Sequence, residues 1–374
     1  MKIRAAVLEE MGRQPPYAQS LPLTIGEIEL QGPKSGEVLV KMAAAGLCHS
    51  DLSVIDGNRP RPVPMVLGHE AAGIVEEVGA NVHDLKPGDH VALVFVPSCG
   101  HCLPCASGRP ALCEPAAAAG GAGTLLSGER RLSRDGHDLN HLLGVAAFAE
   151  YATCSRRSLV KIDPELPLDH AALFGCAVLT GVGAVVNTAR IEPGSTVAVV
   201  GLGGVGLSTI LGAVAAGAER IVAVDLAEDK LALAASLGAT DAFVAGEGAA
   251  QAIKDATGGG VHYAFEMAGA VPALDLAYRI TRRGGTTITA GLPNPNALLS
   301  LPALNLIAEE RTLKGSYMGS AVPSRDIPRY IGLFKRGKLP VDRLLTRHIR
   351  LEDINEGFDR LREGREIRQI LTFG

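Results

Sequence analysis

The stretch from Val197 to Asp225 constrains the fold more than any other part of this sequence. It reads VAVVGLGGVGLSTILGAVAAGAERIVAVD, which is an apolar β-branched run, a glycine-rich turn, a small-residue helix and a second apolar run that ends in an acid. The glycines at Gly201, Gly203 and Gly206 allow a tight turn, a close approach of the backbone to a pyrophosphate, and close packing of helix on strand. Because the amino terminus of the helix offers unpaired N–H groups, the stretch predicts a dinucleotide site.

Asp225 indicates which dinucleotide this site prefers. Its carboxylate, at the tip of the second strand, is expected to accept hydrogen bonds from the ribose hydroxyls of the adenosine. A 2′-phosphate at the same place would meet a negative charge, so the sequence favours NAD(H) over NADP(H). Gly204 and Val205, within the glycine-rich turn, complete the predicted cofactor contacts. The alternative is that the glycines serve only the geometry of a strand-to-helix turn.

Length and charge exclude several classes of protein. The 374 residues suggest about two domains. The 36 basic and 40 acidic residues give a net charge of −4 without a run of like charge, so nothing indicates nucleic-acid binding. No apolar stretch approaches the ~20 residues of a membrane helix, and the N-terminal MKIRAAVLEE lacks the long apolar region of a signal peptide. We therefore expect a soluble, cytoplasmic protein.

Four of the seven cysteines lie close together in the sequence, at Cys99, Cys102, Cys105 and Cys113. Four thiolates on a short segment would repel one another without a cation, and this spacing is typical of a closed tetrahedral zinc site. Disulfides and an iron–sulfur cluster are the alternatives. Cys154 has no partner spacing and is expected to be an ordinary core thiol.

Two short polar motifs in apolar surroundings suggest a second metal site. The first is Cys48-His49-Ser50-Asp51 and the second is Gly68-His69-Glu70. Each alone is an ordinary core motif, but with Cys176 they supply two thiolates and one imidazole. Catalytic zinc takes three protein ligands and keeps a fourth position open. Sequence spacing does not prove that Cys176 meets the other two.

From about Pro193 the sequence alternates between strand and helix patterns. After the two strands described above, four more apolar runs predict a six-stranded, doubly wound parallel sheet. The predicted strands are Asp241–Ala245, Tyr263–Met267, Thr286–Ala290 and Thr312–Tyr317, and two of the predicted helices are Glu228–Leu237 and Val271–Thr281.

The first third of the chain shows a different pattern, with short strands and turns. The alanine- and glycine-rich stretch Ala116–His141 predicts a surface loop. After about Ala321 the chain becomes amphipathic and charged, which predicts a return to the first domain. The predicted strands are Glu37–Lys41, Ala72–Val78 and His90–Val94.

These ordered motifs resemble the zinc-dependent medium-chain alcohol dehydrogenases over nearly the whole chain, in the branch of class I and class III enzymes. The resemblance implies an NAD-binding Rossmann domain at residues 179–322. It implies a mainly β, GroES-like catalytic domain from residues 1–178 and 323–374, with a zinc lobe at about 95–115. A homodimer through the strand near Leu313 is expected, with a tetramer as the alternative. The motifs are CHSD at Cys48, GHE at Gly68, the four-cysteine lobe, GC at Gly175, GLGGVG at Gly201, Asp225 and the closing IRQILTF.

The resemblance also assigns roles to residues. Cys48, His69 and Cys176 would bind a catalytic zinc oriented by Asp51 and Glu70, so that two zinc ions are expected per chain. The other assigned residues have simpler alternatives: a solvated helix face for Lys230, a surface ion pair for Arg368, and ordinary core packing for Phe95, Leu142 and Leu143. Their expected contacts are His49 and Arg368 with the pyrophosphate, Lys230 with the ribose, Thr180, Ala290 and Leu292 with the nicotinamide, and Ser50, Phe95, Leu142 and Leu143 with the substrate.

The chemistry implied by the resemblance is hydride transfer between an alcohol and NAD⁺. Zinc would polarise the substrate oxygen and the Ser50 hydroxyl would take the alcohol proton. We expect a primary or secondary alcohol, with aromatic and medium-chain alcohols as candidates. A thiol-adduct formaldehyde dehydrogenase of the glutathione or mycothiol type, a dismutase with tightly held NAD, and a nucleotide-binding structural or sensory protein are the alternatives.

The sequence departs from its relatives at two places. Ser53 stands where many class I enzymes continue the proton relay through a histidine. Ala117 stands where glutathione-dependent formaldehyde dehydrogenases carry an arginine, and Asn58-Arg59-Pro60-Arg61 supplies two cations where that class has acids. We therefore predict that S-hydroxymethylglutathione is a poor substrate.

Overall fold

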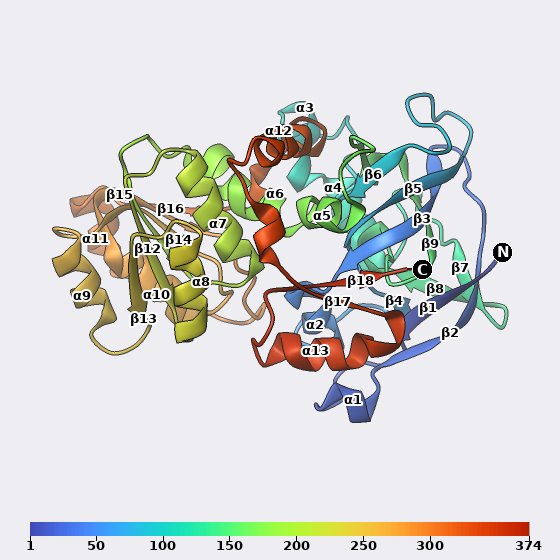
Figure 1. The fold of residues 1–374 in the computed structure, drawn as a ribbon, viewed down its shortest axis with the longest axis horizontal. Coiled ribbons are helices and arrows are strands. Elements are labelled where there is room, and N and C mark those ends of the chain that lie inside the picture. The colour runs from blue at the N-terminus through green and yellow to red at the C-terminus, as the bar shows by residue number, and fades with distance from the viewer. Residues whose placement is uncertain (374) are drawn as a thin grey trace. The chain divides into compact units, whose positions relative to one another are not determined.

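The computed structural model describes residues 1–373, which form two compact units (Figure 1). The first unit consists of Met1–Cys176, Val322–Ile331 and the described chain from Asp342 onward. The second consists of Ala177–Ala321 and Gly332–Val341. The names catalytic domain and NAD-binding domain, with the boundaries given above, remain predictions.

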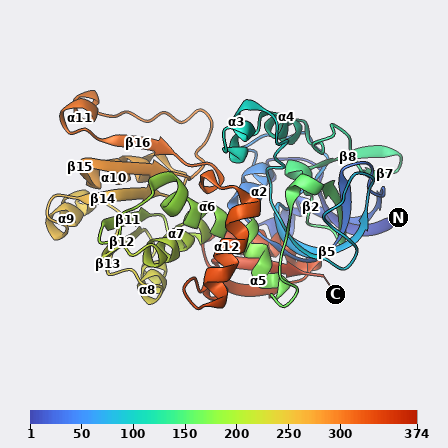
Figure 2. The ribbon, with the colours of Figure 1, turned by 90° about the horizontal axis from the view of Figure 1, so that it is seen from above.

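The second unit contains six parallel strands in the order β13-β12-β11-β14-β15-β16, which Figure 2 shows from edge to edge. The order reverses direction after β11, so the predicted doubly wound α/β sheet is confirmed. The apolar residues of β11 are buried, as expected of a central parallel strand. The strands are β11 (Thr196–Val200), β12 (Arg220–Asp225), β13 (Asp241–Val244), β14 (Val261–Glu266), β15 (Thr281–Thr289) and β16 (Thr312–Gly315).

Helices alternate with these strands along the chain, as the sequence pattern predicts. Helix α7 follows β11 directly and begins at the glycine turn. The helices are α6 (Ala177–Gly183), η5 (Ala184–Ala189), α7 (Gly204–Ala215), α8 (Glu228–Ser236), α9 (Ala249–Ala256), α10 (Val271–Ile280), α11 (Ala303–Ala308) and η6 (Met318–Ser320).

The first unit is mainly β, as predicted, and contains a closed barrel and a second sheet. The barrel order is β1-β2-β7-β8-β4, and the sheet order is β10-β6-β5-β3-β18-β17, with β9 also paired to β3. The strands are β1 (Lys2–Leu8), β2 (Leu23–Leu30), β3 (Glu37–Gly46), β4 (Met65–Val66), β5 (Glu70–Val78), β6 (His90–Leu93), β7 (Leu132–Arg134), β8 (His137–His141), β9 (Tyr151–Ser155), β10 (Leu159–Lys161), β17 (Leu345–Ile349) and β18 (Arg368–Thr372).

Short helices connect these strands, and most are only one or two turns long. Helix α12 (Pro323–Lys335) begins in the first unit, and its last residues, from Gly332, belong to the second. The others are α1 (Tyr17–Ser20), α2 (His49–Ile55), α3 (Leu103–Ala106), η1 (Pro110–Leu112), α4 (Glu114–Ala122), η2 (Leu142–Gly144), η3 (Arg156–Ser158), α5 (Leu168–Ala172), η4 (Leu173–Gly175), η7 (Val341–Leu344), η8 (Leu351–Asp353) and α13 (Ile354–Arg362).

The prediction of a surface loop at Ala116–His141 is wrong. This stretch begins inside helix α4 and also contains the hairpin β7–β8. The hairpin joins the barrel by pairing with β2 and β4. Leu132 and Leu139 of the hairpin are buried in the barrel core. The composition of the stretch misleads because its few apolar residues are the ones that face the core.

Among the described residues, no single helix has the length and apolar composition to span a membrane. One bent pair of helical segments, Leu168–Gly175 with Ala177–Ala189, is together long and apolar enough to do so.

Candidate active site and metal centres

Three predicted ligands meet in the first unit and form a buried cluster. Cys48 stands at the start of α2, His69 directly before β5, and Cys176 directly after η4. Their ligand atoms all lie within 4.8 Å of one another, and the Cys176 Sγ is 3.5 Å from the His69 Nε2. Zinc bound to sulfur at about 2.3 Å and to nitrogen at about 2.0 Å would hold these atoms about 3.5 Å apart. The cluster therefore fits a three-ligand zinc site.

Asp51 fixes the orientation of the His69 ring. Its Oδ1 lies 3.1 Å from the His69 Nδ1 and accepts a hydrogen bond from the Gly68 N–H at 3.0 Å. With the Nδ1 proton directed at Asp51, the Nε2 lone pair points to the Cys176 side. This arrangement of carboxylate, histidine and ligand position is the one that supports a bound metal in zinc enzymes.

The charges around the cluster suit a cation. Burial lowers the pKa of His69, but the negative charges of Asp51 and Cys48 outweigh it and the pKa is raised well above its usual value. The hydrogen bond from Cys176 lowers the pKa of Cys48 well below its usual range, against the effect of burial. The negative charge of Asp51 and Cys48 that raises the pKa of His69 is charge that a divalent metal ion, bound by a neutral His69 and a thiolate, would neutralise.

Arg368 lies at the edge of this cluster and is almost completely buried. Its Nη1 is 3.9 Å from Glu70 Oε2 and donates to the Leu47 carbonyl at 3.3 Å. Burial lowers the pKa of Arg368, while the charges of Glu70 and Cys48 raise it, and the net shift is upward. The guanidinium is therefore positively charged here, and the surface ion pair considered for Arg368 is wrong because the residue is not at the surface.

The four-cysteine lobe forms a second candidate metal centre, which includes α3 and η1. Its ligand atoms also lie within 4.8 Å of one another. The Sγ atoms of Cys99 and Cys105 are 4.0 Å apart, and those of Cys102 and Cys113 are 3.9 Å apart. Tetrahedral zinc with bonds of about 2.3 Å places its sulfurs about 3.8 Å apart, whereas a disulfide bond is only about 2.05 Å long. All four cysteines are free thiols, so the disulfide alternative is wrong.

Backbone N–H groups stabilise a thiolate at Cys99 in this lobe. The N–H groups of His101 and Cys102 donate to the Cys99 Sγ at 3.5 and 3.3 Å. These bonds, the one from His101 first, lower the pKa of Cys99 to about 6. Cys154, by contrast, lies in the core away from the lobe, where burial raises its pKa to about 12.

The predicted dinucleotide turn is present in the second unit. Gly203 directly precedes helix α7, and a Cβ atom built on it would meet nothing within 4 Å. A Cβ atom on Gly206 would lie 1.8 Å from the Gly201 carbonyl oxygen, so helix and turn pack too closely for any side chain there. Asp225, at the end of β12, accepts hydrogen bonds from the N–H groups of Leu202 at 2.6 Å and Ala227 at 3.1 Å.

The sequence did not indicate Glu266, which organises the neighbouring edge of this turn. It ends β14 and is buried. Its Oε1 accepts from the N–H groups of Ala268 and Gly269 at 2.8 and 2.6 Å, and its Oε2 accepts from the Thr289 hydroxyl at 2.6 Å. The available signal was an acid closing an apolar strand, the same signal that singled out Asp225.

The structure places the remaining predicted residues as follows, and their roles stay predictions. Phe95 packs edge-on against the His69 ring at 5.5 Å between centroids. In the first unit, His49 is exposed and Ser50 half-buried in the first turn of α2, and η2 carries buried Leu142 and half-buried Leu143. In the second unit, Thr180 is buried in α6, Lys230 is half-buried on α8, Ala290 follows β15, Leu292 is exposed, and Gly204 and Val205 open α7.

Comparison with known proteins gives matches over the whole chain. Residues 34–164 match the alcohol dehydrogenase GroES-like domain family, and residues 204–336 match the zinc-binding dehydrogenase family. Putative alcohol dehydrogenase D of Mycobacterium tuberculosis is 40% identical over 376 residues, covering 100% of both chains. The NDMA-dependent alcohol dehydrogenase of Amycolatopsis methanolica is 40% identical over 377 residues, covering 99% of both chains.

Solved structures give the same result. Benzyl alcohol dehydrogenase from Acinetobacter calcoaceticus is 32% identical with a TM-score of 0.93, and the match covers 100% of both chains. An alcohol dehydrogenase zinc-binding domain protein from Burkholderia ambifaria is 36% identical with a TM-score of 0.94, covering 100% of this chain and 99% of the other.

Proposed function

The chain belongs to the zinc-containing medium-chain alcohol dehydrogenases, and we propose that it transfers hydride reversibly between a primary or secondary alcohol and NAD⁺. Membership makes it a zinc-dependent enzyme, which removes the structural or sensory protein considered from the sequence. The observation that carries the proposal is the buried cluster of Cys48, His69 and Cys176, oriented by Asp51.

The cluster would hold the catalytic zinc, which when bound supplies Lewis-acid polarisation of the substrate oxygen. Asp51 keeps the Nδ1 proton of His69 and so directs Nε2 to the metal position. Ser50, two residues after Cys48, would accept the alcohol proton through its hydroxyl. Ser53 donates its own hydroxyl proton to the His49 carbonyl at 2.8 Å. We therefore propose that protons leave by water rather than through position 53.

The cofactor assignment depends on the turn before α7. We propose that Gly201, Gly203, Gly204, Val205 and Gly206 hold the pyrophosphate. Asp225 would accept hydrogen bonds from the adenosine ribose, and NAD(H) would be preferred because the carboxylate repels a 2′-phosphate. The further cofactor contacts proposed, each by position in the family, are His49, Thr180, Lys230, Ala290, Leu292 and Arg368.

The four-cysteine lobe would hold the second, structural zinc, giving two ions per chain. Closed Cys₄ sites stabilise the fold and take no part in the reaction. We further propose a homodimer, with a tetramer as the alternative, and a cytoplasmic location stays a prediction.

An aromatic or medium-chain alcohol is the proposed substrate class. Phe95 presents an aromatic ring beside His69, and Leu142 is buried in the same apolar core as Leu67 and Leu93. The similar protein from Acinetobacter calcoaceticus is named a benzyl alcohol dehydrogenase, which supports an apolar, ring-accepting channel.

The test is a panel of alcohols and aldehydes run with NAD⁺ and NADP⁺, followed by NADH absorbance and by zinc analysis. Cys48→Ser is expected to abolish turnover and to remove one zinc, and Cys102→Ser is expected to remove the other and destabilise the fold. The panel is repeated with NDMA as electron acceptor, because a 40% identical relative is named for its dependence on NDMA. Turnover of S-hydroxymethylglutathione far above that of simple alcohols would favour the thiol-adduct alternative instead.

A further inference from the structure

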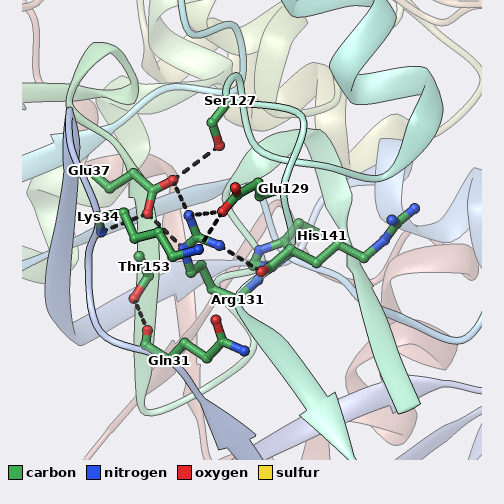
Figure 3. Close-up of polar contacts among 9 residues, drawn as sticks. Gln31, Lys34, Glu37, Ser127, Glu129, Arg131, His141 and Thr153 are labelled. Atoms are coloured by element: carbon green, nitrogen blue, oxygen red, sulfur yellow. Dashed lines mark hydrogen bonds and ion pairs between the residues drawn. The ribbon is translucent and has the colours of Figure 1, made fainter.

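A buried polar network holds the hairpin β7–β8 against the start of β3 (Figure 3). Arg131 donates from Nε and Nη2 to the two carboxylate oxygens of Glu37 at 2.8 and 2.9 Å, and the two side chains are only 2% and 4% exposed. Ser127 donates to Glu37 at 3.0 Å, and Glu129 joins Arg131 to Lys34 at 2.6 and 2.9 Å. Both oxygens of the buried carboxylate are therefore satisfied, and Arg131 is held in a fixed place.

His141, the last residue of β8, extends this network by its side chain. The Arg131 N–H donates to its Nε2 at 3.0 Å. The hairpin register ends at the pair Leu132 and Leu139, so the imidazole accepts a hydrogen bond from the next backbone N–H in place of a strand carbonyl. Burial, with the charges of Arg130 and Arg131, lowers the pKa of His141 to about 3. Both the lowered pKa and the hydrogen bond that Nε2 accepts indicate a neutral ring at neutral pH.

This arrangement has a cost that an apolar side chain would avoid. The imidazole is completely buried, and its Nδ1 has no hydrogen-bond partner among the described residues. A buried polar atom without a partner loses its hydrogen bonds to water and gains none in return. What a leucine or a methionine at position 141 could not supply is the acceptor for the Arg131 N–H.

The turn that follows His141 ends against the two residues that precede His69. Leu143, Gly144 and Ala146 all have positive φ, at 53°, 70° and 56°. At the far end of the turn, the N–H groups of Ala147 and Phe148 donate to the carbonyls of Gly68 and Leu67, both at 3.0 Å.

The near end of the turn is held to the same part of the chain. His141 pairs with Val66 of β4, two residues before Gly68 and three before His69. Non-glycine residues in the left-handed region are strained and persist only where their surroundings fix them. Here the surroundings are a backbone anchor beside His69 at one end and the His141 network at the other.

We propose that His141 is a positioning residue that sets substrate selectivity. By accepting the Arg131 N–H it fixes the start of the turn from Leu142 to Ala146, and with it the place of the Leu143 side chain in the substrate channel. The selectivity part of this inference rests on the proposed function, because Leu142 and Leu143 contact substrate only in an alcohol-oxidising site.

The first measurement is independent of activity. Hydrogen exchange is followed in wild type, His141→Leu, His141→Gln and His137→Leu. His141→Leu removes the acceptor, and the amides of Val145, Ala147 and Phe148 are expected to exchange about 10-fold faster, which corresponds to about 1.4 kcal/mol. His141→Gln keeps an acceptor oxygen and should exchange like wild type. His137→Leu, at the exposed start of β8, is the matched control.

The second measurement is the ratio of kcat/KM for benzyl alcohol to that for ethanol. His141→Leu is expected to change this ratio about 10-fold, mainly through KM, while His141→Gln restores it to near the wild-type value. If His141→Leu does not fold, His141→Asn takes its place, because its shorter amide is polar but does not reach the Arg131 N–H.

Two results would overturn the inference. In the first, His141→Leu lowers thermal stability but leaves both the ratio and the exchange of the turn unchanged, which is a structural role alone. In the second, His141→Gln fails to restore either readout. A wild-type protein without alcohol turnover would overturn the proposed function and the selectivity claim together, whereas fast exchange confined to His141→Leu would still support the anchoring role of the imidazole.

Discussion

Asp51 uses a single carboxylate oxygen to accept hydrogen bonds from two neighbouring donors, the Gly68 N–H and the His69 Nδ1–H. Its negative charge therefore both orients the imidazole and raises its basicity. In Asp51→Asn the shape remains but the charge is lost, and outer partners of this kind are worth 10–100-fold, to order of magnitude, in metal affinity. We expect the variant to lose its catalytic zinc to a chelator at about 10–100-fold lower concentration while keeping the structural zinc.

Zinc content measured during a chelator titration checks this prediction about Asp51. The matched control is Asp56→Asn, at the exposed end of the same helix. If Asp51→Asn and Asp56→Asn both hold two zinc ions as tightly as wild type, Asp51 does not support the metal site.

Asp225 is the residue on which the cofactor assignment depends. Its two oxygens already accept N–H groups from Leu202 and Ala227, so the carboxylate is held in place before any ligand binds. Asp225→Ser removes the charge that would repel a 2′-phosphate. We expect the ratio of kcat/KM for NADP⁺ to that for NAD⁺ to rise at least about 10-fold, which corresponds to about 1.4 kcal/mol.

The cofactor ratio of Asp225→Ser is compared with that of Asp229→Ser, an exposed acid in the first turn of α8. Only the Asp225 variant should move the ratio. Unchanged cofactor preference in both variants would show that the ribose is bound elsewhere.

At the scale of elements, the turn between β11 and α7 uses its glycines for two different reasons. A Cβ on Gly206 would lie 1.8 Å from the Gly201 oxygen, whereas a Cβ on Gly203 meets no protein atom within 4 Å. We therefore expect Gly206→Ala to destabilise the protein by several kcal/mol, as an overpacked or strained site does, to order of magnitude. Gly203→Ala should fold normally but bind NAD⁺ at least about 10-fold more weakly, because the methyl group would occupy the approach of the pyrophosphate.

Thermal unfolding and NAD⁺ titration separate these two effects on the glycines. Gly212→Ala in the same helix is the comparison, since a Cβ there first meets a backbone atom at 3.0 Å. A Gly203→Ala protein that binds NAD⁺ like wild type would contradict the pyrophosphate assignment.

Elements built from contiguous patterns were the ones that the sequence could predict. The strand that ends in Asp225 and the other sheet strands were found to within two residues at each end, because a buried parallel strand has a local apolar signature, except that β15 begins at Thr281 rather than at the predicted Thr286. The hairpin β7–β8 was missed because its partners lie far away in the sequence: strands β2 and β4 pair with it, and Glu37, which holds Arg131, is 94 residues from that arginine. No local pattern records such a partner, and an Ala- and Gly-rich neighbourhood favours a loop.

At the scale of the whole molecule, the candidate metal sites also differ in whether their residues are close together in the sequence. The zinc lobe could be predicted from spacing alone, since its four cysteines are close together in the sequence. The cluster of Cys48, His69 and Cys176 could not, because its members come from three separate segments and only the resemblance to known enzymes joined them. Arg368, from the last strand, reaches Glu70 across about 300 residues of sequence, and its burial was likewise not predictable.

The edge of the six-stranded sheet carries the last prediction, which concerns assembly. Strand β16 has no partner on its outer side within the described chain, all four of its residues are exposed, and Figure 2 shows α11 beyond the same edge. Leu304 and Ile307, both on α11, are 70% and 79% exposed. An unpaired strand beside exposed apolar side chains is an edge that proteins usually cover, and a second copy of the chain would cover it.

Ile307→Glu places a charge in that proposed interface. Burying an unpaired charge costs several kcal/mol, so we expect the dimer to dissociate at protein concentrations at least about 100-fold higher than wild type requires. Leu226→Glu is the matched control, because Leu226 is also 79% exposed in the second unit but lies near β12 and not at the β16 edge. Light scattering over a dilution series measures the mass of each variant. A wild-type protein that is monomeric throughout, or an Ile307→Glu dimer as stable as the Leu226→Glu dimer, would exclude β16 and α11 as the interface.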